Sequence, residues 1–234
     1  MSFTTRMGTT FSENKNQNKS YIAFFDLDKT LIRANSGVIL LRVAYRKNLI
    51  SVTDILKALW LSFLFRFNLR DTEKIISSMV RWLSGIPERE LNELVSEAFE
   101  KHLTELVPAR AKSEIMLHKS KNALVVILSS ALQPVCKCIA DHLGMDDIIC
   151  TELESVEGKF TGLPSGKLCF GNEKKTRLLE YCEKINRLKE DVWFYSDSMD
   201  DLPALNVAGH PVCVNPGRRL KNHAVKKEWQ IVTW

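Results

Sequence analysis

The chain has 234 residues, enough for one large domain or for a core domain with a smaller insertion. Hydrophobic residues make up 45% of the sequence and charged residues 26%, a composition typical of soluble globular proteins. The net charge of +5 is mild. No run reaches the roughly 18 apolar residues that a membrane-spanning helix needs, which argues against an integral membrane protein.

The two ends of the sequence are polar. Residues 1–20 contain no apolar h-region, so we expect a disordered leader rather than a signal peptide. The other end is basic from Arg218 to Lys227. We interpret it as a solvated terminal face; contact with anionic lipid is a less favoured alternative, and no nucleic-acid partner is expected. The oligomeric state cannot be inferred from these patterns.

Six cysteines are scattered without a CxxC pair, at positions 136, 138, 150, 169, 182 and 213. This spacing suits neither a zinc knuckle nor a disulfide framework. We therefore expect reduced core thiols and a cytoplasmic protein.

The first predicted strand is the run Tyr21–Phe25, which leads directly into Asp26, Asp28 and Thr30. A short apolar run of this kind is typical of a buried strand in a parallel sheet. Isolated buried charge is costly, so the carboxylates should emerge at the carboxyl end of the strand. Ligands of open α/β sheets bind at that edge.

Residues 37–107 show helical spacing of apolar positions and no strand signal. A crossover between parallel strands needs only about a dozen residues, so this stretch predicts an inserted all-helical domain. We expect a lid over the carboxylates, with a purely structural subdomain as the alternative. The core would then comprise residues 21–36 and 108–234.

The remaining elements alternate between helix and strand. We expect helices at 108–120, 133–143, 173–189 and 203–208, strands at 123–128, 147–151, 192–195 and 210–214, and a β-hairpin within 152–169. This order predicts an α/β fold with a parallel sheet and right-handed crossovers.

Three predicted strands end in polar clusters, and neighbouring parallel strands would bring these clusters to one edge. The clusters are Asp26/Asp28/Thr30, Ser129/Ser130 and Asp197/Asp200/Asp201. Carboxylates gathered there would raise one another's pKa unless a cation lay among them, and an all-oxygen ligand set favours Mg²⁺. One carboxylate could then attack a phosphoryl group as a nucleophile, forming an aspartyl-phosphate.

These motifs resemble the haloacid dehalogenase superfamily, and within it the phosphoserine-phosphatase-like subfamily IB. Asp26-Leu-Asp28-Lys-Thr30 matches the DxDxT motif, Ser129 the serine of motif two, Lys174 the family lysine, and Asp197-Ser-Met-Asp200-Asp201 the acidic motif four. The resemblance covers nearly all of the chain from Tyr21 onward. It implies a Rossmann-like core with a small helical cap of the C1 type.

The resemblance also implies a role for each motif residue. Asp26 would be the nucleophile and a Mg²⁺ ligand; Asp28 would be the general acid and base, with its carbonyl on the metal. Ser129 would hold phosphate, and Lys174 would neutralise the phosphate and Asp26. Asp197 would ligate Mg²⁺, with Asp201 fixing the site directly or through water.

Other candidates also have simpler interpretations. Thr30 could order the loop or cap a helix rather than contact substrate, Ser130 could be a plain turn residue, and Lys175 competes with Lys174. Asn35 lies where phosphoserine phosphatases carry a glutamate that binds the substrate's amine, and Asp200 lies where they usually carry asparagine. These departures put an amino-acid phosphate substrate in doubt, and whether Asp200 joins the metal site stays open.

We therefore expect a Mg²⁺-dependent phosphomonoesterase acting on a small phosphorylated metabolite, such as phosphoserine or a related compound. One alternative is a lipid phosphate such as phosphatidylglycerophosphate, suggested by the apolar stretch 59–67 and the basic end. Another is a receiver module phosphorylated on aspartate. Receivers are about half this length and have no insertion after the first strand.

Overall fold

The structure, a computed structural model, describes residues 19–53, 56, 80–98 and 104–234. Most of the expected leader and the middle of the expected helical insertion, including the apolar stretch 59–67, lie outside the described residues.

Six parallel strands form the central sheet, in the order β3-β2-β1-β6-β7-β8. They are β1 (Ile22–Phe25), β2 (Leu124–Leu132), β3 (Asp147–Thr151), β6 (Val192–Ser196), β7 (His210–Val214) and β8 (Gln230–Val232). Strand β1 lies inside the sheet, where Phe25 is in register with Ile127 of β2 and with Tyr195 of β6. The predicted α/β fold with a parallel sheet is confirmed.

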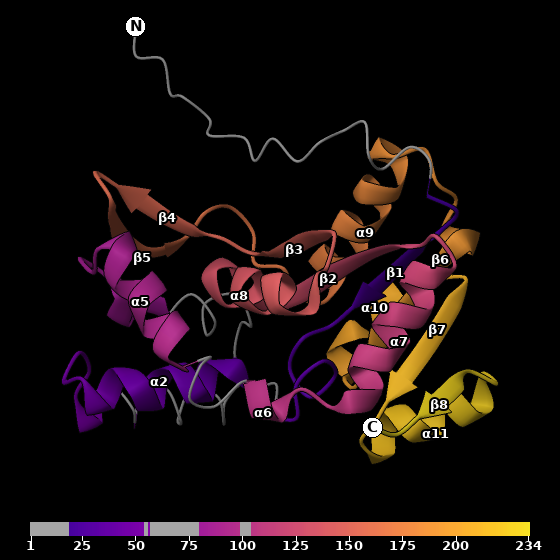
Figure 1. Ribbon diagram of the computed structural model, residues 1–234, viewed down its shortest axis with the longest axis horizontal. Helices are drawn as coiled ribbons and strands as arrows, with labels where there is room; N and C mark the ends of the chain where they lie inside the picture. Colours follow the sequence, from indigo (N-terminus) through magenta and orange to yellow (C-terminus); the bar gives the residue numbers. More distant parts are fainter. Residues whose placement is uncertain (1–18, 54–55, 57–79, 99–103) are drawn as a thin grey trace, which may run out of the picture.

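Helices cover both faces of this sheet. Every residue of β1 is therefore buried, and its side chains alternate between two hydrophobic clusters. Phe25 packs on the face covered by α7 (Ala109–Ser120) and α8 (Gln133–Leu143). Phe24 packs on the opposite face, against α9 (Asn172–Lys184), α10 (Leu202–Leu205) and α11 (Arg218–Lys226). Figure 1 shows the two layers of helices around the sheet.

The described part of the expected insertion is helical. It contains α2 (Ser36–Arg46), the 3-10 turn η1 (Arg81–Leu83), α5 (Glu88–Ala98) and α6 (Thr104–Leu106). Helices α2 and α5 pack on each other and bury apolar stripes that include Leu40, Val43, Leu91 and Leu94. These stripes continue one of the two sheet clusters, so the helices and the core share apolar packing. The expected domain boundaries remain a prediction.

The predicted hairpin consists of β4 (Leu153–Val156) and β5 (Lys159–Pro164), paired antiparallel. It is hydrogen-bonded to the start of α5: Gly85 N–H donates to the Phe160 carbonyl (2.8 Å), and Phe160 N–H donates to the Ile86 carbonyl (2.9 Å). Glu88 N–H also donates to the Gly158 carbonyl (2.9 Å). The hairpin thus extends from the core to the helices of the insertion, as Figure 1 shows at α5 and β5.

Some element boundaries differ from expectation. Strand β2 continues to Leu132 through an irregular register beyond Leu128, instead of ending before the serine pair. Helix α9 ends at Lys184 because Asn186 adopts a left-handed φ of 53°, which an α-helix cannot include. The 3-10 turns η3 (Lys189–Asp191) and η4 (Met199–Asp201) lie on either side of β6, and α10 stops at Leu205.

The basic end is more than the solvated face that we expected. Helix α11 buries Leu220 and Ala224 against the sheet and keeps its arginines and lysines exposed, and β8 then adds a sixth strand beside β7. The exposed charges agree with the expected solvated face, but the sequence analysis missed α11 and β8. Leu220 and Ala224, four positions apart, form the buried side of this helix, and the surrounding charges conceal the short pattern.

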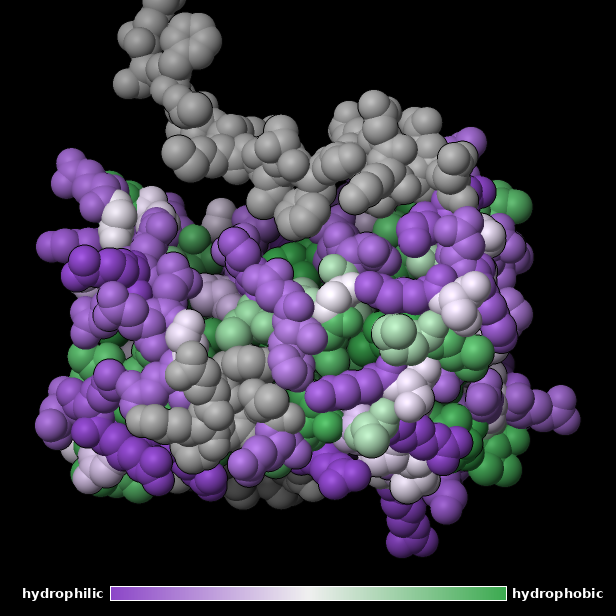
Figure 2. Space-filling model, in the orientation of Figure 1, coloured by the Kyte–Doolittle hydropathy of each residue, from purple (hydrophilic) through white to green (hydrophobic). Residues whose placement is uncertain are grey.

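Five of the six cysteines are buried, as expected for core thiols. No helix among the described residues is long and apolar enough to cross a membrane. Figure 2 shows hydrophilic residues spread over one face of the molecule, with hydrophobic residues between them.

Candidate active site

The carboxyl edge of the sheet gathers the acidic motifs. Asp26 directly follows β1, and Asp197 directly follows β6, the strand beside it. Ser129 lies on the other neighbour of β1, two residues beyond Ile127. Parallel strands end on the same side, so the fold brings all three polar clusters to one edge.

A buried cluster around Lys174 forms the centre of this site. The Lys174 ammonium donates to Asp26 Oδ1 (2.8 Å) and also contacts both oxygens of Asp201 (2.8 and 2.9 Å). All three residues are at least 94% buried. Lys174 lies in the first turn of α9, which Arg177 ties to β3 by donating to the Cys150 carbonyl (2.7 Å). A lysine from a helix thus meets carboxylates from two separate loops.

Ser196 is a member of the cluster that the sequence analysis missed. It is the last residue of β6, fully buried, and its hydroxyl donates to Asp201 Oδ2 (2.6 Å). The Ser196 hydroxyl oxygen in turn accepts from Ser198 N–H (3.1 Å). The available signal was a hydroxyl directly before an acidic motif, at the end of an otherwise apolar strand. Ser196 orients Asp201 toward Lys174.

Burial and charge act in opposite directions on this cluster. Burial raises the pKa of Asp26 to about 7; Lys174 opposes this shift, and Asp201 reinforces it. Burial alone would lower the pKa of Lys174, but the charges of Asp201 and Asp26 outweigh it and raise that pKa above its ordinary value. Lys174 therefore supplies the positive charge that faces Asp26 and Asp201.

Asp28 is held by the helical insertion. Its Oδ1 accepts from the main-chain N–H of Ser36 (2.9 Å), and Ser36 is the first residue of α2. Burial raises the pKa of Asp28, and this hydrogen bond opposes the shift. Asn35, predicted to contact substrate, is exposed, and its Oδ1 accepts from Val38 N–H (3.0 Å). It therefore caps α2, and substrate contact by Asn35 remains a prediction.

The hydroxyl candidates occupy three different environments. Ser129 is buried, and its hydroxyl accepts from Ala131 N–H (3.3 Å), whereas Ser130 is exposed. Thr30 is 1% exposed, and its Oγ1 has no hydrogen-bond partner within the described part of the chain. Substrate contacts by these residues remain predictions, and the burial of Thr30 agrees better with a loop-ordering role.

The remaining two aspartates differ in exposure. Asp197 is partly buried; burial raises its pKa to about 6, with Lys29 lowering it and Asp201 raising it further. Asp200 is exposed and hydrogen-bonded to Ser198, whose hydroxyl lies 3.2 Å from Asp200 Oδ2. Asp197 therefore lies close to the charges of the cluster, and Asp200 faces outward.

Mg²⁺ at this site remains a prediction. In the described ranges, no three His, Cys, Asp or Glu side chains form a group that could hold a metal. Mg²⁺ usually binds through one or two carboxylates, with water and substrate phosphate as the other ligands. Asp26 and Asp197 are carboxylates that could serve such a site, and burial is the main cause that raises the pKa of each.

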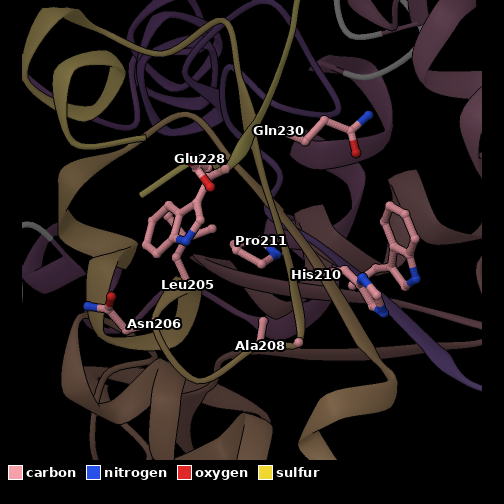
Figure 3. A pocket seen from close by; sticks show the side chains of 10 residues that line it. Leu205, Asn206, Ala208, His210, Pro211, Glu228 and Gln230 are labelled. Atoms are coloured by element: carbon pink, nitrogen blue, oxygen red, sulfur yellow. The ribbon is translucent and has the colours of Figure 1, made fainter. Parts of the chain in front are cut away.

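A separate cavity of about 320 Å³ lies near the amino ends of the strands, away from the carboxyl ends that carry the acidic motifs. Trp193, His210 and Gln230, at or near the amino ends of β6, β7 and β8, help to line it, together with Trp229 (Figure 3). The acidic cluster lies beyond the other ends of these parallel strands. This cavity is therefore distinct from the candidate active site.

Comparison with known proteins agrees with this geometry. The family model of the haloacid dehalogenase-like hydrolases matches residues 23–206. A "Probable phosphatase" of Mycobacterium tuberculosis is 28% identical over 215 residues, covering 91% of this chain and 75% of that protein. A phosphoserine phosphatase of the same organism is 27% identical (89% and 69% covered), and a histidinol-phosphatase of Neisseria meningitidis is 25% identical (91% and 98%).

Solved structures share the fold. A protein of unknown function from Bordetella pertussis has a TM-score of 0.83 at 23% identity, covering 90% of this chain and 97% of that one. A phosphoserine phosphatase solved as a phospho-aspartyl intermediate analogue has a TM-score of 0.67 at 19% identity, with 92% and 93% covered. The chain therefore belongs to the haloacid dehalogenase-like hydrolase family, as an enzyme of the phosphoric monoester hydrolase class.

Proposed function

We propose that the protein is a Mg²⁺-dependent phosphatase of small phosphorylated metabolites that works through a phosphoryl group on Asp26. The observation that carries the proposal is the contact of the Lys174 ammonium with Asp26 Oδ1, because it fixes one oxygen of a buried carboxylate and leaves Oδ2 for the substrate. Phosphoryl transfer depends mainly on such positioning and charge neutralisation.

The reaction assigns different tasks to the two carboxylates. Asp26 Oδ2 attacks phosphorus as the bond to the leaving oxygen breaks, and Asp28 donates a proton to the departing alcohol. Asp28 then takes a proton from the water that attacks the phosphoryl-Asp26, which releases inorganic phosphate and restores both residues. Ser36 N–H on Asp28 Oδ1 holds the acid–base group in place through both steps.

Mg²⁺ would be held by Asp26, Asp197 and the Asp28 carbonyl, and it would neutralise phosphate charge when bound. Asp201 contacts Lys174 and Ser196, so its position supports this site through those residues. Ser129 and neighbouring N–H groups would hold phosphate oxygens at the end of β2.

Phosphoserine or a related amino-alcohol phosphate is a suitable first substrate class, since relatives include a phosphoserine phosphatase and a histidinol-phosphatase. The exposed, helix-capping Asn35 carries no charge to pair with a substrate amine. A panel of phosphorylated amino acids, amino alcohols, sugars, nucleotides and lipids would identify the substrate. The lipid alternative depends on the stretch 59–67, outside the described residues, and absence of binding to anionic vesicles would remove it.

The function is tested by Asp26→Asn. The wild type should release inorganic phosphate steadily from p-nitrophenyl phosphate with Mg²⁺ and lose this activity in EDTA, and the variant should show none. Uncatalysed hydrolysis is too slow to interfere. Wild-type turnover in Asp26→Asn would refute the mechanism. A receiver module would instead retain one phosphate on each chain without turnover.

A further inference from the structure

Trp234 reaches the loop that carries both catalytic carboxylates. Its indole Nε1–H donates to the Thr30 carbonyl over 2.7 Å, across 204 positions of sequence. The ring stacks on Tyr195, with ring centroids 5.8 Å apart and planes 26° from parallel. Tyr195 is a fully buried residue of β6, so the indole rests on a rigid part of the sheet.

The main chain of Trp234 is itself held in place. Asn215, the residue after β7, accepts from Trp234 N–H through Oδ1 (3.1 Å) and donates to the Trp234 carbonyl through Nδ2 (3.0 Å). Asn215 N–H in turn donates to the Val232 carbonyl of β8 (2.9 Å). In the strand order β1-β6-β7-β8, Trp234 therefore connects the β7–β8 side of the sheet to the loop after β1, passing over β6.

The loop it reaches is a tight turn closed by its own main chain. The Leu27 carbonyl accepts from Thr30, Leu31 and Ile32 N–H at 3.3, 2.9 and 3.0 Å. Lys29 takes a left-handed φ of 59°, which is unfavourable for a side chain of its size. A turn with such a residue keeps its shape only if its surroundings fix it. The Thr30 carbonyl is one such fixing point, because Thr30 is buried and its carbonyl needs a donor.

We propose that Trp234 is a positioning residue for catalysis: its indole N–H fixes the Asp26–Thr30 turn and thereby sets Asp28 relative to the substrate. This inference rests on the proposed phosphatase function for its kinetic consequence. Its structural consequence, a rigid turn, does not depend on any activity.

The kinetic test is Trp234→Phe, which keeps an aromatic ring on Tyr195 and removes the N–H donor. We expect kcat for p-nitrophenyl phosphate to fall about tenfold with KM nearly unchanged, because Asp28 acts in the chemical step and not in binding. The matched control is Trp193→Phe. Trp193 also stacks on Tyr195, with ring centroids 6.3 Å apart and planes 18° from parallel. The Trp193→Phe variant should keep the wild-type kcat.

Hydrogen exchange supplies a readout that is independent of activity. Amides of Thr30, Leu31 and Ile32 should exchange faster in Trp234→Phe than in Trp193→Phe or the wild type. Asn215→Gly provides a second variant, which releases the Trp234 main chain and suits the left-handed φ of 42° at position 215. Asn215→Gly should lower kcat and speed exchange at the same amides, both to a smaller extent. It therefore provides the test if Trp234→Phe folds poorly.

The outcomes separate the two proposals. A wild type without phosphatase activity, but with exchange accelerated in Trp234→Phe, would refute the proposed function and leave the structural role of Trp234 standing. An active wild type, with kcat and exchange alike in Trp234→Phe, Asn215→Gly and Trp193→Phe, would overturn the positioning role. A rise in KM at constant kcat would also overturn it, because that result indicates a substrate contact.

Discussion

Ser36 donates its main-chain N–H to Asp28 Oδ1, so the first turn of α2 and the second carboxylate of the catalytic loop are directly joined. The start of α2 therefore contacts a residue of the candidate active site. The side chain that stabilises this first turn is Asn35, the N-cap of α2.

Asn35→Ala should fray this turn. Loss of an N-cap costs about 1 kcal/mol of unfolding free energy, and the loosened Ser36 N–H should reduce kcat several-fold. Asn35→Asp keeps a capping oxygen and should retain both stability and kcat. Urea unfolding and steady-state kinetics on both variants check this. An increase in KM for Asn35→Ala with kcat intact would instead mean that Asn35 contacts the substrate.

Lys174→Met should remove both activity and stability. Without the ammonium, Asp26 and Asp201 are left as buried carboxylates without their cation, which costs on the order of 3 kcal/mol. We expect kcat to fall by about two orders of magnitude or more.

Lys175→Met is the matched control, since the neighbouring residue is only partly buried. Thermal unfolding and phosphate release distinguish the two variants. Equal losses in both would show that helix α9, and not the Lys174 charge, is responsible.

Ser196→Ala should weaken the site through Asp201. The variant leaves the buried Asp201 Oδ2 without the 2.6 Å hydroxyl contact, a loss of about 1–2 kcal/mol of stability. We expect kcat to fall about tenfold as Asp201 loses its orientation toward Lys174. The comparison is Ser198→Ala, a partly exposed serine nearby, which should change stability by less than half as much. Calorimetry and kinetics that rank the two in the opposite order would contradict this role.

His118 predicts a pH dependence of stability away from the active site. The ring is buried between two tyrosines: Tyr21 hydroxyl lies 2.9 Å from Nδ1 and Tyr195 hydroxyl 2.7 Å from Nε2. The Tyr195 hydroxyl donates its hydrogen bond to Glu114 Oε1 (2.8 Å), so it can only accept from His118 Nε2. In the neutral ring, Nε2 therefore carries the hydrogen, and Nδ1 accepts from the Tyr21 hydroxyl. Burial lowers the pKa of His118 from 6.5 to about 4, against the charge of Glu114.

Because the folded state resists protonation of His118, its contribution to stability is complete above pH 6.5. As the pH falls toward 4, the unfolded chain binds a proton that the folded chain does not, and the loss reaches on the order of 3 kcal/mol. His118→Gln cannot titrate and should show a shallower decline over this range. Urea unfolding at pH 7, 5.5 and 4.5 tests this; parallel curves for the two proteins would refute it.

Much of the fold could be predicted from the sequence because it depends on local patterns. The buried runs of β1 and β6 and the end of α8 at Gly144, with its left-handed φ of 62°, carry signals within a few residues. The second half of β2 and the α11–β8 end carry weak signals, since their placement depends on partners far along the chain.

The candidate site shows the same division. Asp26, Asp28 and Asp197 follow predicted strands, so the sheet topology alone brings them to one edge. The contacts of Ser196 with Asp201 and of Trp234 with Thr30 arise only when separate elements pack together. The spacing of Trp234 and Thr30 does not predict their contact, and for Ser196 the sequence offers only a hydroxyl directly before an acidic motif.

The hydrogen bonds between the hairpin and the start of α5 limit how the insertion can move. A cap joined to a core by its two chain connections alone could rotate as a rigid body about those connections. Here the Phe160 and Gly158 contacts also join the start of α5 to the hairpin. Movement of residues 85–88 away from the hairpin would therefore break three main-chain hydrogen bonds.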